Sequence, residues 1–170
     1  KVWEIGRRIP APERVAEARE RIKGPVTHKD WVWAKETLLL DALIAKKRDV
    51  EVEVQAIQVG PVVCLSNPAE YFVSYGLQLK KRSGFPMTFP VELANGCVGY
   101  VPDEEAFGPN GGGYETRLTS YSNLDITAGT QFMNVGLELA AKMKPAKLPE
   151  RPNGPAGKPW AYGDQPPQLK

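Results

Sequence analysis

Residues 51–70 read EVEVQAIQVGPVVCLSNPAE, and this stretch decides the fold. From Glu51 to Val59 polar and apolar residues alternate with a period of two, which is typical of a half-buried strand. Gly60 interrupts the alternation, and residues 61–66 then form a short, continuous apolar run. Such a run suits a strand that is buried on both faces. The brief Gly-Pro break between the two runs predicts a hairpin.

Helical patterns lie on both sides of this hairpin. Apolar spacing and proline positions predict helices over residues 13–23, 27–47, 67–81 and 127–144. The second of them has a broad apolar face that we expect to be buried, made of Trp31, Leu38, Leu39, Ala42 and Leu43. Residues 85–93 predict a further strand, and the two prolines that interrupt it indicate irregular pairing or an edge position. Residues 1–9 predict an arm or an edge strand. The fold class is therefore α/β, with a mixed sheet flanked by helices.

Composition divides the chain into three parts. Residues 1–24 are an N-terminal arm and a charged surface helix, and residues 25–144 form the α/β domain. Residues 145–170 are a proline-rich tail without periodicity, in which Trp160 and Tyr162 are candidates for contact with the domain or with a partner.

The overall charge argues against several classes of partner. Twenty-two basic and 20 acidic residues give a net charge of +2, which is too balanced to predict binding to nucleic acid or to an anionic membrane. No apolar run is long enough for a transmembrane helix. The chain begins at Lys1 without a signal peptide or an initiating methionine, so we expect a processed or truncated polypeptide. Its two cysteines, Cys64 and Cys97, are expected to be buried free thiols, with a disulfide as the alternative.

A glycine-rich segment that begins at the end of the predicted strand over residues 85–93 is the main candidate site. Residues 91–115 contain six glycines between positions 96 and 113, together with Tyr100 and Tyr114. Glycine allows close approach of backbone or ligand, and loops carried by a strand are frequent binding sites. No Gly-Lys-Ser/Thr follows, so this is not a phosphate-binding P-loop. Half-buried aromatic residues with hydroxyls at the surface are the alternative interpretation of both tyrosines.

Glu70 has two interpretations of its own. It follows a buried strand, and sites in open α/β sheets form at the carboxyl ends of strands. The spacing from Asn67 to Glu70 also fits a capping box at the start of a helix, which needs no function. His28 is the only histidine, so the chain cannot form a histidine-rich zinc site alone, and its place near a helix start indicates an ordinary polar residue.

The order of these motifs resembles the neutral/alkaline non-lysosomal ceramidase family. A strand is followed by Asn-Pro-Ala-Glu and a helix, then by Asn95 with Tyr100-Val101, by Glu104-Glu105, and by Tyr114-Glu115. The resemblance covers about residues 52–140 and corresponds to the C-terminal part of the family's catalytic domain. It departs from the family at Ala69, in place of the glycine before the glutamate, and at Cys97, in place of a tyrosine.

The resemblance implies a zinc-dependent amide hydrolase that is part of a larger layered α/β catalytic domain. Family members bind zinc through two histidines from earlier in the chain, a glutamate and a tyrosine, which correspond here to Glu70 and Tyr100. A further tyrosine beside the metal corresponds to Tyr114, a catalytic donor to the oxyanion. The substrate is an N-acylsphingosine or a related lipid amide, and the implied location is secreted or extracytoplasmic.

The remaining ligands are then expected from another part of the protein, because no counterpart of the two histidines is present in this chain. The competing hypothesis is a non-catalytic interaction module that keeps the fold without the metal. In that case Glu70 is only a helix cap, and the aromatic tail is the partner contact.

Overall fold

A computed structural model describes residues 1–151 and confirms the predicted α/β fold with a mixed sheet. The predictions for Trp160 and Tyr162 lie outside these residues. The helices are α1 (Pro12–Arg21), α2 (Trp31–Lys46), α3 (Val73–Arg82) and α4 (Ala128–Ala141), with short 3₁₀ helices η1 (Glu104–Phe107) and η2 (Tyr114–Thr116). The strands are β1 (Val2–Gly6), β2 (Asp49–Glu53), β3 (Gln55–Val59), β4 (Val62–Ser66), β5 (Glu70–Tyr71), β6 (Met87–Val91) and β7 (Tyr100–Val101). No helix in the described part of the chain is long and apolar enough to cross a membrane.

The predicted hairpin forms the centre of the mixed sheet. Strand β4 pairs antiparallel with β3 and parallel with β6, in the order β3-β4-β6. Gly60 turns the hairpin with φ of +56°, a conformation that glycine adopts without strain. Strand β6 lies at an edge, as its prolines predicted.

The alternating run 51–59 is not one strand, which corrects the sequence prediction. Its first half continues β2, which pairs antiparallel with β1, and its second half is β3. The chain changes sheets at Val54, which is 1% exposed and donates its backbone N–H to the Lys1 carbonyl at 3.0 Å. Val52, Val54 and Ala56 face the core on both sides of this change, whereas Ile57 and Val59 of β3 are exposed on the opposite face.

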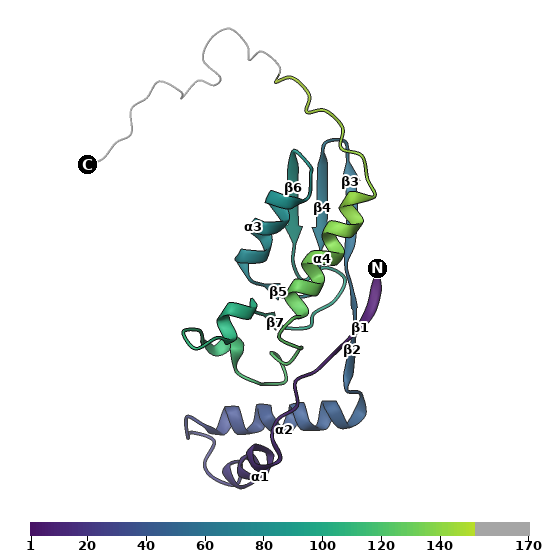
Figure 1. The fold of residues 1–170 in the computed structure, drawn as a ribbon. Coiled ribbons are helices and arrows are strands. Elements are labelled where there is room, and N and C mark those ends of the chain that lie inside the picture. The colour runs from purple at the N-terminus through teal and green to yellow at the C-terminus, as the bar shows by residue number, and fades with distance from the viewer. Residues whose placement is uncertain (152–170) are drawn as a thin grey trace, which may run out of the picture.

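Helices α3 and α4 cover one face of the sheet (Figure 1). Val63 and Leu65 of β4 face these helices and are fully buried. Phe132 of α4 lies at the centre of this core and contacts Trp3 edge to face, with ring centroids 5.7 Å apart. Burial of large apolar side chains of this kind is the main source of folding free energy.

The opposite face of the same sheet is open. Val62 and Cys64 are only half-buried, so the prediction that residues 61–66 are buried on both faces is wrong. No helix of residues 1–151 covers this face. Its exposed apolar side chains are Ile57, Val59, Met87, Phe89 and Val91.

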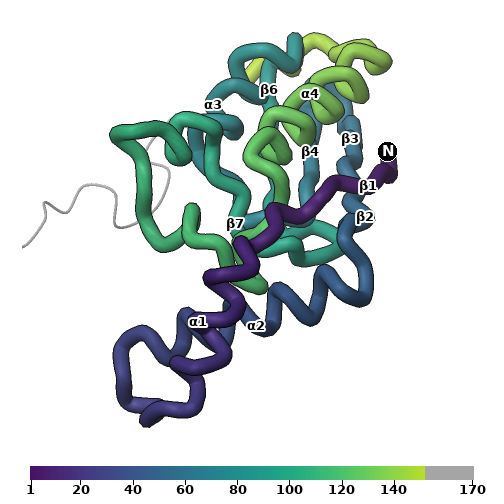
Figure 2. Tube along the Cα trace, turned by 60° about the horizontal axis from the view of Figure 1, so that its bottom comes forward, coloured from purple at the N-terminus to yellow at the C-terminus, as the bar shows by residue number. Residues whose placement is uncertain are grey.

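Helices α1 and α2 form a pair beside the sheets (Figure 2). The predicted buried face of α2 is wrong. Leu39, Ala42 and Leu43 are exposed, and Trp31 and Leu38 are only half-buried. Helix α2 instead buries Ala34, Thr37 and Leu40. The surface helix α1 buries only Val15 and Ala18, so its apolar stripe is too narrow to cover the exposed apolar residues of α2.

Candidate functional site

Strands β5 and β7 place Glu70 beside Tyr100. The two residues are direct partners in a short parallel pair. The Glu70 N–H donates to the Gly99 carbonyl at 2.9 Å, and the Phe72 N–H donates to Val101 at 3.3 Å. Partners in register project their side chains from the same face of a sheet. The carboxylate and the phenol that the resemblance assigns to one site are therefore neighbours.

Glu70 does not cap a helix. The prediction of a helix from Asn67 is wrong, because α3 begins at Val73. The Asn67 side chain accepts the N–H of Ala69 at 2.9 Å, and the Ala69 carbonyl accepts the N–H of Leu93 at 3.2 Å. Long-range pairing with the 93–101 segment thus takes the backbone groups that a helical turn would have used. This removes the capping interpretation.

Three tyrosine rings pack together beside Glu70. Tyr100 lies between Tyr114 and Tyr121, with centroid distances of 5.4 Å and 5.3 Å and edge-to-face geometry in both pairs. Edge-to-face packing of this kind adds about 0.5–1.5 kcal/mol beyond area burial. The structure therefore brings together all three residues that the sequence assigned to the site, namely Glu70, Tyr100 and Tyr114.

Two further residues of the site were missed by sequence reasoning. The Tyr121 hydroxyl donates to Oε1 of Glu70 at 2.7 Å, and Sγ of Cys97 lies 3.4 Å from the same hydroxyl. Cys97 stands at a departure from the family pattern, which was the only signal for it. No sequence signal indicated Tyr121, because it lies in a connector without periodicity. Both cysteines are free, but Cys97 is exposed and Cys64 half-buried, so the prediction of buried thiols is wrong for Cys97.

The Glu70 carboxylate and the adjacent hydroxyls keep the site's phenols protonated. Hydrogen bonding to Tyr114 is the largest cause that raises the pKa of Tyr100 to about 12, followed by loss of water and the charge of Glu70. The pKa of Tyr121 is raised as well, first by Cys97 and then by Glu70. Both phenols therefore keep their protons to a higher pH than a free tyrosine does. A bound cation would reverse this effect, because it favours the ionised phenol.

This pKa shift predicts a loss of stability in strong base. An unfolded tyrosine ionises near pH 10, whereas Tyr100 in the folded chain keeps its proton up to about pH 12. The unfolded state therefore binds fewer protons between these values, and stability falls as pH rises through this window. Urea unfolding at a series of pH values should show the decline, and Tyr100→Phe should make it shallower. An unchanged slope in Tyr100→Phe would contradict this pKa assignment.

A pocket of about 390 Å³ opens beside the tyrosines. Tyr100, Tyr114 and Tyr121 form one wall, and Val32 and Trp33 of α2 form another. Ser120 and Glu36 also line it and hydrogen-bond to each other. A concave, largely aromatic cavity next to a few polar groups is the usual form of a small-molecule site.

The donor set fits one side of a metal site. Glu70, Tyr100 and Tyr121 offer oxygen atoms, and Cys97 adds a sulfur, all of which are possible zinc ligands. Residues 1–151 contain no group of three histidine, cysteine, aspartate or glutamate side chains placed to hold a metal. His28 is exposed in the turn before α2, where its Nδ1 accepts the Asp30 N–H at 3.2 Å.

No protein-family model, curated protein sequence or solved structure matches this chain.

Proposed function

We propose that this chain supplies the glutamate and tyrosine side of a zinc-dependent amide hydrolase site similar to that of neutral ceramidase. The observation that carries the proposal is the direct pairing of Glu70 with Tyr100, with Tyr114 packed on the Tyr100 ring. These residues are 30 and 14 positions apart in sequence, so their convergence is not a consequence of local structure.

Each residue has a role that follows from its chemistry. Glu70 and Tyr100 are the oxygen ligands, and zinc bound there would polarise an amide carbonyl and lower the pKa of a water molecule. Tyr114 is exposed on the outer side of Tyr100, where its hydroxyl can donate to the oxygen of a substrate carbonyl. Tyr121 orients Glu70 through its 2.7 Å hydrogen bond.

The proposal requires a partner and predicts a class of substrate. Two histidine ligands must come from another part of the same protein, because two oxygen ligands leave a zinc site incomplete. The substrate is a lipid amide, such as an N-acylsphingosine, which is cleaved to a fatty acid and an amine. The aromatic pocket beside the tyrosines is suited to an apolar portion of such a molecule.

Metal analysis of the intact natural protein tests this function. We expect one zinc ion per chain and hydrolysis of N-acylsphingosine. Glu70→Gln and Tyr100→Phe should each weaken zinc binding by at least about 100-fold, since loss of even an outer-shell group costs about 10- to 100-fold.

The matched control is Glu105→Gln, which removes an exposed carboxylate from the same loop region without touching the site. It should bind zinc as the natural protein does. Protein without bound zinc, or zinc retained in Glu70→Gln, would refute the hydrolase.

One contact favours the alternative of a non-catalytic interaction module. Glu70 already has a hydrogen-bond partner in Tyr121, so the site is satisfied without a metal. On this hypothesis the protein binds its partner equally well in Glu70→Gln, and the metal analysis above gives no zinc.

A further inference from the structure

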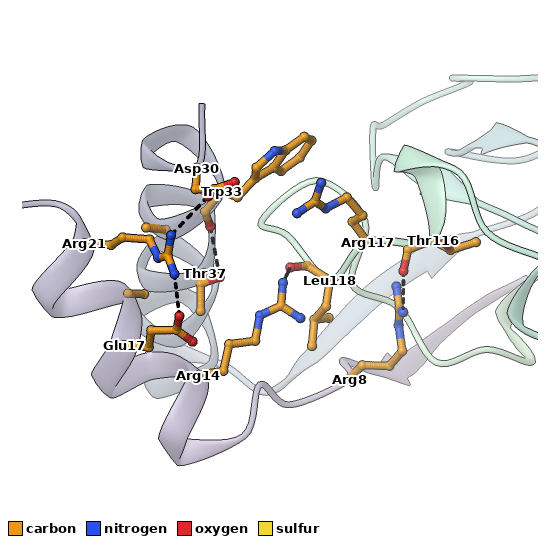
Figure 3. Close-up of a pocket in the computed structure, with 12 residues that line it drawn as sticks. Arg8, Arg14, Glu17, Arg21, Asp30, Trp33, Thr37, Thr116, Arg117 and Leu118 are labelled. Carbon is orange, nitrogen blue, oxygen red and sulfur yellow. Dashed lines mark hydrogen bonds and ion pairs between the residues drawn. The ribbon is translucent and has the colours of Figure 1, made fainter. Parts of the chain in front are cut away.

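A second pocket lies between the α1–α2 pair and residues 116–118, and it shares Trp33 with the pocket of the tyrosines (Figure 3). Its volume is about 650 Å³. Four arginines line it, against two acids. The arginines are Arg8, Arg14, Arg21 and Arg117, and the acids are Glu17 and Asp30.

Both acids form ion pairs with the same arginine. Arg21 forms ion pairs with Glu17 at 2.6 Å and with Asp30 at 3.0 Å, so these three charges leave one net negative charge on that wall (Figure 3). Arg14 and Arg117 form no ion pair within residues 1–151. The opposite wall of the pocket is therefore positively charged.

Arg8 is the fixed charge of this wall. Its guanidinium donates to the carbonyls of Thr116, Ser122 and Leu124 at 2.9–3.2 Å, which ties β1's continuation to the 116–124 segment. Burial is the main cause that lowers the pKa of Arg8, Asp125 opposes this shift, and the like charge of Arg14 adds to it. The two cations are thus close enough to repel each other.

Arg14 and Arg117 keep donors for a ligand. Within residues 1–151, Arg14 donates one side-chain N–H, to the Leu118 carbonyl at 3.1 Å. Arg117 stacks its guanidinium on the Trp33 ring, 3.9 Å from the centroid, and this leaves the N–H edge of the group unused. Figure 3 shows both guanidinium groups at the pocket, with that of Arg14 bonded to the Leu118 carbonyl.

We propose that this pocket binds a phosphate group. The N–H donors of Arg14 and Arg117, together with the positive charge of Arg8, suit an anion with three or more acceptor oxygens. Arginine recognises phosphate through such paired N–H donors. Such an anion also relieves the repulsion between Arg8 and Arg14. The pocket is larger than a phosphate ion, so the ligand carries a substituent as a phosphate monoester. The site does not depend on zinc or on the hydrolase proposed above.

Calorimetric titration of the full chain with inorganic phosphate, at constant ionic strength, tests the site. We expect saturable binding of one phosphate. Arg14→Gln and Arg117→Gln should each weaken it by at least about 10-fold, because a hydrogen bond to a charged group contributes about 1.5–3 kcal/mol. Arg8 is left unchanged, since its removal would break its hydrogen bonds to three backbone carbonyls.

Arg19→Gln is the matched control, because Arg19 lies on the same helix but points away to Asp41. It should bind phosphate as the natural chain does, and Glu70→Gln should too. Circular dichroism of the variants verifies that they are folded. Vesicles of phosphatidylcholine with and without phosphatidic acid then identify the source: Arg14-dependent binding to the second kind alone assigns a lipid headgroup. No saturable binding to either probe, or equal weakening by Arg19→Gln, would overturn the proposal.

Discussion

Gly99→Ala is expected to unfold the candidate site. Gly99 has φ of +77°, and a Cβ there would lie 1.7 Å from the Tyr121 carbonyl oxygen. This carbonyl accepts the Tyr100 N–H at 3.1 Å, so it cannot retreat without breaking the contact that holds Tyr121 against β7. The substitution combines left-handed strain of about 1–2 kcal/mol with a backbone clash, and we expect a total loss of at least about 3 kcal/mol. Urea unfolding measures it.

Gly84→Ala is the matched control for this effect. Gly84 has the same φ of +77°, but a Cβ there would meet nothing within 4 Å. Only backbone strain should therefore destabilise Gly84→Ala, which lowers its free energy of unfolding by about 1–2 kcal/mol. Equal losses in the two variants would mean that strain alone acts at Gly99, and that the approach of residue 121 to β7 is not tight.

The fold could be predicted wherever the sequence carries a period. Alternation and the Gly60 break gave the hairpin, and proline gave the edge position of β6. The division of the 51–59 run between two sheets was not predictable, because Val54 continues the same alternation. Exposure of Leu39 and Leu43 was not predictable either, since the apolar face of a helix does not indicate which element packs against it.

The site was predictable only in part, and from the motif order. Tyr100 and Tyr114 were singled out by the glycines around them, and Glu70 by its place after β4. The true partner of Asn67 to Glu70 is the 93–101 backbone, a long-range pairing that no local signal encodes. Tyr121 was missed for the same reason, because its contact with Glu70 spans 51 residues of sequence.

Phe132→Ala should cause the largest loss of stability in the helix-covered core. Phe132 is 2% exposed and packs against Trp3 of β1 and Tyr71 of β5. Replacing a buried phenylalanine with alanine leaves a cavity and typically costs about 3–5 kcal/mol. Because Tyr71 follows Glu70 directly, the cavity also loosens the strand that carries the carboxylate. The free energy of unfolding in urea gives the value.

Phe89→Ala is the same chemical change on the open face of the sheet. Phe89 pairs with Cys64 across β4 and is 49% exposed, so its removal creates no cavity and should cost less than about 1 kcal/mol. The difference in unfolding free energy between the two variants measures how much more apolar packing lies on the helix-covered face of the sheet than on the open face. If Phe89→Ala is as costly as Phe132→Ala, this face is covered in solution, and the sheet has a second buried layer beyond residues 1–151. A small effect instead leaves the apolar side chains of β3 and β6 at the surface, and the sheet is then stabilised from the face that α3 and α4 cover.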